Sequence, residues 1–199
     1  MITRKEMTRM LLKEGLLSWL ANNSFESVTV TSLCKASGIT RSTFYLHYSN
    51  IMEIVDDLVD DAIAYSKPGM VDNNNLQTIA NTLSAASNSV SLREAYDSIF
   101  DRLPLCQRII RHKKYLPLFL DEQISEYVLQ RIIGREKDRQ GLVMAEALGT
   151  SFDVGVSVFV FLVHGLYAVN KQYKWSQSDE WLEAQKVIFE LVCRGLQRK

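Results

Sequence analysis

The stretch "TVTSLCKASGITRSTFYLHY", residues 29–48, decides the fold of the N-terminal part of the chain. It holds two short segments with helical apolar spacing, separated by a turn that contains Gly38. Thr29 or Thr31 can cap the first segment and Thr40 the second, while Gly38 suits a left-handed residue that ends the first helix. Two short helices joined in this way form a helix-turn-helix, a unit whose second helix lies in the major groove of DNA.

Residues suited to contact nucleic acid gather in the second of these helices, predicted over residues 41–47. Arg41 is the one residue in it with the planar fork that reads guanine O6 and N7. Tyr45 follows four positions later on the same helical face, from which it can reach the sugar-phosphate backbone. Taken singly, a hydroxyl-rich helix start is more often a plain cap and a tyrosine more often part of the core. Together, at this spacing, they favour DNA binding.

The distribution of charge agrees with a DNA-binding head, although the net charge of the 199 residues is zero. Residues 1–50 contain six Lys and Arg against three acidic residues, and residues 51–66 contain five acidic residues and no base. Only the head is therefore expected to meet a polyanion. Three prolines, nine glycines and 47% apolar residues predict a globular, all-α chain.

The apolar periodicity and the helix signals predict the order of helices. Thr3 with Glu6 has the form of a capping box, and the first helix should end near Asn22. Ser49 or Asn50 should open a helix over 51–66. Further helices are expected over 74–89, 91–102 (opened by Ser91 with Glu94), 104–113, 117–138, 149–173 and 178–197. "KPGMVDNNN", residues 67–75, has turn chemistry and marks a boundary. The expected domains are 1–50, a connecting helix over 51–66, and 67–199.

Residues 3 to about 55 resemble the N-terminal DNA-binding domain of TetR-family transcriptional regulators. The threonine that opens the second helix, the "KASGIT" turn, "STFY" and the His-aromatic ending all fall in register. The resemblance implies a helix-turn-helix domain followed by a C-terminal helical domain that binds a small effector and forms a homodimer through its last two helices. From the spacing of the Cys and His residues we expect no metal site, and we expect no cofactor and no enzymatic activity.

The resemblance also implies a role for each residue of the motif. Thr29 and Thr31 would approach phosphates, Arg41 and Ser42 would face bases, and Thr40, Thr43, Tyr45 and His47 would contact the backbone or cap the helix beside it. Leu46 stands at a position that is often polar or aromatic in the family, where it either touches a thymine methyl group or shields the turn. The family usually has a lysine where this chain has Ile51, so one phosphate contact is expected to be lost.

The C-terminal part carries an apolar stripe that indicates a dimer. Its members are Val154, Val158, Phe161, Leu162, Gly165 and Val169, with apolar residues around much of the remaining circumference. A helix of this kind is buried on all sides, either in a core or in a subunit interface. With the amphipathic last helix, we expect a symmetric four-helix seam. The candidate effector pocket consists of Phe100, Leu103, Tyr115, Phe119, Met144, His164 and Tyr167, all of which are also ordinary core residue types.

Three interpretations of function follow from these features. The first is a ligand-responsive, sequence-specific regulator, expected to be a repressor, that binds a palindromic operator as a homodimer. The alternative is a regulator-like protein that acts mainly through protein partners with a weakened DNA-binding head. An enzyme is disfavoured because no nucleophile-base pair, metal spacing or phosphate loop is visible. Three widely spaced cysteines and an N-terminus without an apolar core predict a reduced, cytoplasmic protein with no membrane span.

Overall fold

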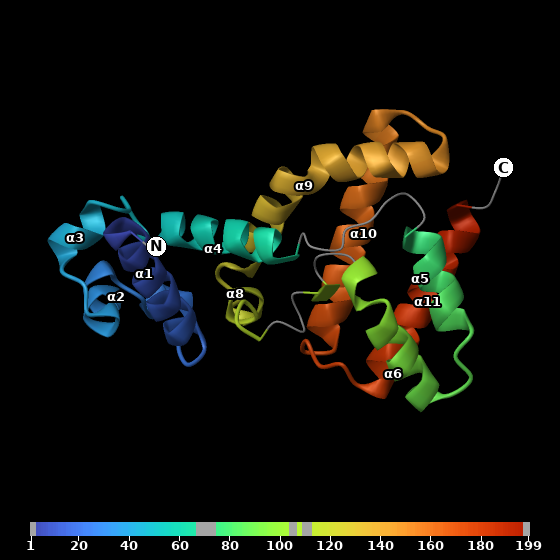
Figure 1. The fold of residues 1–199 in the computed structure, drawn as a ribbon, viewed down its shortest axis with the longest axis horizontal. Helices are drawn as coiled ribbons and strands as arrows, with labels where there is room; N and C mark the ends of the chain where they lie inside the picture. Colours follow the sequence, from blue (N-terminus) through green and yellow to red (C-terminus); the bar gives the residue numbers. More distant parts are fainter. Residues whose placement is uncertain (1–2, 67–74, 104–106, 109–112, 197–199) are drawn as a thin grey trace. The chain divides into compact units, whose positions relative to one another are not determined.

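The chain folds into α-helices, which confirms the expected all-α class (Figure 1). The computed structural model describes residues 3–66, 75–103, 107–108 and 113–196, and no strand occurs in these ranges. The chain divides into two compact units, Met1–Tyr65 with His112–Ile132 and Ser66–Arg111 with Ile133–Lys199. Each unit is therefore assembled from two separate segments, whereas the predicted boundaries after residues 50 and 66 assume contiguous domains.

The first unit contains four N-terminal helices and a second segment from the middle of the chain. Its elements are α1 (Arg4–Leu20), the 3-10 turn η1 (Phe25–Ser27), α2 (Val30–Ser37), α3 (Arg41–Tyr45), α4 (Ile51–Ser66), α8 (Pro117–Leu120) and the beginning of α9 (Ser125–Leu148). The side chain of Thr3 accepts from the Glu6 N–H while Glu6 reaches back to Thr3, so the predicted capping box is present. The core includes the fully buried Leu16, Leu33 and Phe44.

In the first unit, α1 and α2 pack closely against each other at Gly15. Gly15 of α1 faces Ser37 of α2, and a Cβ placed at Gly15 would also lie 3.3 Å from Leu33 Cδ1. A side chain at position 15 would therefore push against α2, the first helix of the predicted helix-turn-helix.

The second unit is built around the last helix. Its elements are α5 (Asn75–Ser84), α6 (Ser89–Ser98), the 3-10 turn η2 (Phe100–Arg102), the remainder of α9, α10 (Phe152–Gln172) and α11 (Asp179–Leu196). α11 packs against both α5 and α6. Gly155 lets α10 approach α9 closely, because a Cβ there would meet the Gly141 carbonyl and lie 2.7 Å from the Ala145 nitrogen.

Several predicted helix boundaries are wrong. The helix expected over 74–89 ends at Ser84. The helix expected to begin at Ser91 begins at Ser89, because Asn88 is its cap and Ser91 is the partner three residues later. The helix expected over 117–138 consists of α8 and α9, and α9 continues to Leu148. The break occurs at Asp121, whose backbone is extended and whose carboxylate accepts the N–H of Gln123. Most of the helix predicted over 104–113 lies outside the described residues.

The apolar helix α10 has one buried and one exposed side. Phe159 and Val163 are buried, whereas Val154 is 47% and Phe161 74% exposed. In a single chain the helix is therefore not buried all round, and its predicted stripe faces outward. Among the described residues, α10 is long and apolar enough to cross a membrane by length and composition alone, a test that core helices of soluble proteins also pass.

Candidate nucleic-acid interface

The first helix of the motif, α2, has the predicted cap and the predicted turn. Thr29 caps it, since its side chain accepts the Ser32 N–H at 3.0 Å, and Thr31 lies exposed in the first turn. Gly38 ends the helix with φ +66°, and the Ile39 N–H donates to the Cys34 carbonyl at 2.9 Å. No heavy atom lies within 4 Å of a Cβ built at Gly38. The left-handed backbone, rather than lack of space, therefore favours glycine here.

The second helix, α3, begins with a cluster of hydroxyl groups. Thr40 caps α3 because its oxygen accepts the Thr43 N–H at 3.2 Å. Its hydroxyl also lies 3.0 Å from that of Ser42 and 2.8 Å from that of Thr43. α3 ends at Tyr45, two residues before the predicted end. The hydroxyls thus fix the start of the helix and at the same time lie at its exposed or half-buried surface.

The side chains of residues 41–48 divide into buried anchors and exposed contacts. Phe44 and Tyr48 belong to the core, with 0% and 3% of their surface exposed. Arg41 and Ser42 are exposed, as are Tyr45 at 53% and Leu46 at 80%. Thr43 and His47 are half-buried. The predicted base-reading and backbone-contacting residues therefore lie together on one short segment that the two aromatic anchors hold in place.

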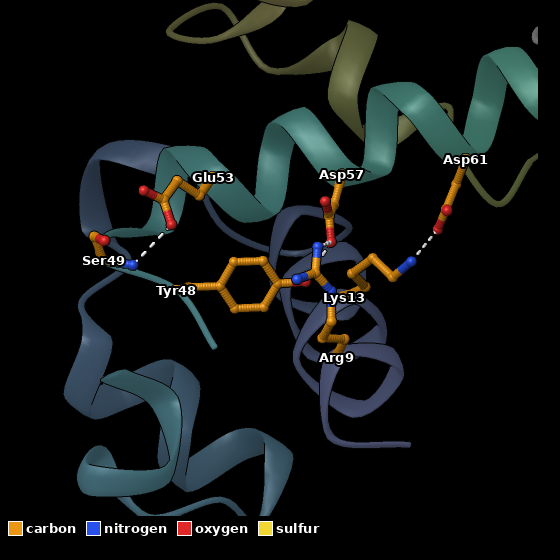
Figure 2. Close-up of polar contacts among 7 residues, drawn as sticks. All are labelled: Arg9, Lys13, Tyr48, Ser49, Glu53, Asp57 and Asp61. Atoms are coloured by element: carbon orange, nitrogen blue, oxygen red, sulfur yellow. Dashed lines mark hydrogen bonds and ion pairs between the residues drawn. The ribbon is translucent and has the colours of Figure 1, made fainter. Parts of the chain in front are cut away.

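Two basic residues of α1 are paired with carboxylates of α4, which Figure 2 shows. Arg9 forms an ion pair with Asp57, and Lys13 forms one with Asp61. The Tyr48 hydroxyl donates to the same Asp57 carboxylate at 2.6 Å, and the Arg9 guanidinium lies 4.8 Å from the centroid of the Tyr48 ring. This cluster fastens α1, the end of the helix-turn-helix and α4 to one another.

The cluster shifts the pKa values of two of its members. Burial raises the pKa of Tyr48 well above its usual value, and the hydrogen bond to Asp57 raises it further. For Arg9, burial is the largest single effect and acts to lower the pKa, but the hydrogen bond to Asp57 and the further interactions with Tyr48 and Asp57 together outweigh it, so the pKa is raised. Both groups are therefore held protonated in the folded state.

These pairs reduce the positive charge that the head can offer to a polyanion. Of the six basic residues in 1–50, Arg9 and Lys13 are neutralised by α4. In the described part of the chain, no ion pair is formed by the other four, which are Arg4, Lys5, Lys35 and Arg41. Sequence reasoning treated the basic head and the acidic α4 as separate features, although the structure brings them together.

The side chains of Asn50 and Glu53 cap the beginning of α4. Asn50 accepts the Glu53 N–H at 3.1 Å. Figure 2 shows the second contact, in which the Ser49 N–H donates to the Glu53 carboxylate at 2.8 Å. Ile51 is half-buried beside them. The first turn of α4 therefore carries the acidic Glu53, and the loss of a phosphate contact at Ile51 stays a prediction.

A contact that the sequence analysis missed joins the motif to the second segment of the unit. Asp121, only 9% exposed, accepts the Phe25 N–H of η1 at 2.6 Å. Asp56 of α4 accepts from the Tyr127 hydroxyl at 2.7 Å and pairs with Arg131 at 2.7 Å. Residues 96 positions apart in the sequence carry no local signal for such a contact.

The seven residues of the predicted effector pocket fall in both compact units. Tyr115 and Phe119 belong to the first unit, and the other five, which are Phe100, Leu103, Met144, His164 and Tyr167, belong to the second. Phe100 and His164 are half-buried and the remaining five are buried. The pocket as a whole stays a prediction. Within the described ranges, no group of three or more His, Cys, Asp or Glu side chains is arranged to hold a metal ion.

Comparison of the chain with protein-family models, with curated proteins and with solved structures finds no match in any of the three.

Proposed function

We propose that this protein is a ligand-responsive transcriptional regulator that binds a palindromic DNA operator as a homodimer and acts in the cytoplasm. One observation carries the proposal. α2 and α3 meet through a left-handed Gly38, and Arg41, Ser42, Tyr45 and Leu46 are exposed from the second helix and its end. This is the arrangement of a helix that enters the major groove.

The exposed apolar side chains of the last two helices support the dimer. Phe161 of α10 is 74% exposed, and on α11 Val187 is 45% and Leu191 63% exposed. Large apolar patches on a folded protein typically mark an interaction site, and we assign these exposed side chains to one. A two-fold dimer would bury it and would present two recognition helices to two half-sites, about 34 Å apart along the DNA.

A second function is favoured by specific features of the head. Leu46 is 80% exposed, and Arg9 and Lys13 are paired within the protein. An apolar side chain and a reduced positive charge suit a protein partner better than a phosphate backbone. Under this alternative, the chain is a regulator-like protein that acts mainly through protein partners.

Selection of bound duplexes from a random DNA pool separates the two functions. Wild-type protein should recover a palindrome, and Arg41→Ala should lose its affinity for that palindrome about 5- to 150-fold, since a bidentate contact to guanine contributes about 1–3 kcal/mol. Arg102→Ala is the matched control, because Arg102 is an exposed arginine of the second unit.

The outcomes are distinct. Loss with Arg41→Ala alone supports a sequence-specific head. If the wild type recovers nothing above background at low salt, DNA binding is refuted, and the search moves to a protein partner. Equal losses with both variants would mean that Arg41 contributes only general charge.

A further inference from the structure

The core of the second unit contains an unusual concentration of uncharged polar side chains. Gln107, Asn170, Trp181 and Gln185 each have no exposed surface, and Tyr96 is 2% exposed. They come from α6, α10, α11 and the short described stretch at residues 107–108. Polar side chains of this kind are mostly found at the surface, so their burial calls for a physical reason.

Hydrogen bonds and one ring contact join these side chains into one network. The Gln107 amide donates to Gln185 Oε1 at 3.0 Å, and the Tyr96 hydroxyl donates to Gln107 Oε1 at 3.4 Å. The rings of Tyr96 and Trp181 meet edge to face, with centroids 5.2 Å apart. The Trp181 indole N–H then donates to Asn170 Oδ1 at 2.9 Å. The network therefore connects α6, α10 and α11 through polar groups and aromatic faces.

Among the residues that the structure describes, three polar groups beside or within this network have no hydrogen-bond partner. They are the buried donors Asn170 Nδ2 and Gln185 Nε2 and the buried Tyr167 hydroxyl. Tyr167 lies three residues before Asn170 on α10, and its ring packs edge to face on Trp175 at 5.6 Å. Residues three apart share one face of a helix. A buried polar group without a partner costs about 1–3 kcal/mol.

The chemistry of these groups defines what would satisfy them. Two amide N–H groups call for acceptors, and a hydroxyl can donate or accept. Aromatic rings flank them, and the network itself carries no charge. The neighbouring Arg108 is also buried, but it has interactions of its own. A charged ligand would lose its hydration and find no countercharge in the network. A neutral ligand with acceptor oxygens needs no countercharge.

We propose that this polar cluster is an effector site for an uncharged aromatic small molecule with at least two hydrogen-bond acceptors. The polar cluster consists of Tyr96, Gln107, Tyr167, Asn170, Trp181 and Gln185. The inference rests on the proposed function, which it deepens by naming the chemistry of the ligand. Of the predicted pocket residues, only Tyr167 belongs to it.

Three probes of similar shape test the chemistry. Methyl 4-methoxybenzoate is neutral with three acceptor oxygens, 4-methoxybenzoate is an anion, and 4-ethyltoluene has no acceptor. Binding to the full-length chain is measured by quenching of tryptophan fluorescence, because Trp181 and Trp175 are buried at the cluster. We expect the neutral ester to bind at least tenfold more tightly than either of the other two. Equal binding of all three, or no binding of the ester, overturns the proposal.

Two variants test the location. Tyr167→Phe removes a hydroxyl that has no partner and Gln185→Met removes an amide, and each should weaken binding of the ester about tenfold. Tyr173→Phe is the matched control, since Tyr173 lies half-buried at the end of the same helix, outside the cluster. Tyr167→Phe should leave the thermal midpoint unchanged or raised, which separates lost binding from lost folding. Ester binding that neither variant weakens overturns the assignment.

The same samples distinguish this inference from the proposed function. A gel shift with the selected operator reports DNA binding independently of the ester. If the protein binds the operator but not the ester, the polar cluster is not the effector site, and the proposed regulator function is unaffected. A crystal structure in which ordered waters satisfy all three groups, and which soaking with the ester leaves unchanged, would also overturn the inference.

Discussion

Truncation of Phe161 should weaken the proposed dimer strongly while leaving the folded chain intact. The Phe161 side chain is 74% exposed in the single chain, on a face of α10 opposite to the buried Phe159 and Val163. Full burial of a phenylalanine contributes about 1.5–3 kcal/mol, so the exposed part has about 1–2 kcal/mol left to contribute. A two-fold interface contains two copies, which gives about 2–4 kcal/mol for the variant Phe161→Ala.

This free energy corresponds to an increase of about 30- to 1000-fold in the dimer dissociation constant, measured by sedimentation equilibrium. Alanine is at least as good a helix former as phenylalanine, so the thermal midpoint of the monomer should not fall. Val90→Ala is the control, because Val90 is 68% exposed on α6 of the same unit, which is not one of the two helices of the proposed dimer seam. A wild-type chain that stays monomeric at tens of micromolar refutes the reasoning, as does an equal change in both variants.

Three further predictions concern stability, measured by urea unfolding. Because the pKa of Tyr48 is raised in the folded state, its contribution to the unfolding free energy should be constant below about pH 10 and fall as the pH rises further; Tyr48→Phe should reduce the fall of the unfolding free energy above pH 10 by up to about 1.4 kcal/mol per pH unit. Gly155→Ala should cost about 1–3 kcal/mol because its Cβ meets the backbone of α9, whereas Gly134→Ala, with open space around it, should gain about 0.5–1 kcal/mol; equal effects would contradict the close helix contact. Gly38→Ala should cost about 1–2 kcal/mol and Gly38→Asn clearly less, since φ is +66°; a neutral alanine variant would mean that the turn relaxes.

Sequence reasoning succeeded where the determining contacts are local. Thr3 with Glu6, Thr29, Thr40 and the left-handed Gly38 each act within a few residues, and all have the expected roles. Local signals also compete with one another. In the stretch around residues 87–91 several residues can cap a helix, and Asn88 does so where Ser91 was expected.

Sequence reasoning failed where a contact joins distant segments. The carboxylate of Asp121 breaks the helix expected over 117–138 and binds the Phe25 N–H, which lies 96 positions away. The sequence analysis also missed the pairing of Arg9 and Lys13 with α4, because charges counted segment by segment do not show ion pairs between segments. The uncharged polar cluster gave no sequence signal at all, since Gln and Asn are ordinary surface residues until the fold buries them.

The two-part construction of the first unit has a consequence for the synthesis of the protein on the ribosome. Residues 112–132 follow residue 65 only after the intervening stretch has been translated, roughly 3–13 seconds later at about 5–20 residues per second. During that interval the sequence of α1 to α4 has been synthesised, but Phe25 N–H and Asp56 lack the partners that come with Asp121, Tyr127 and Arg131. A fragment that ends at residue 66 would lack these contacts permanently, so a minimal head that keeps them must include the later segment.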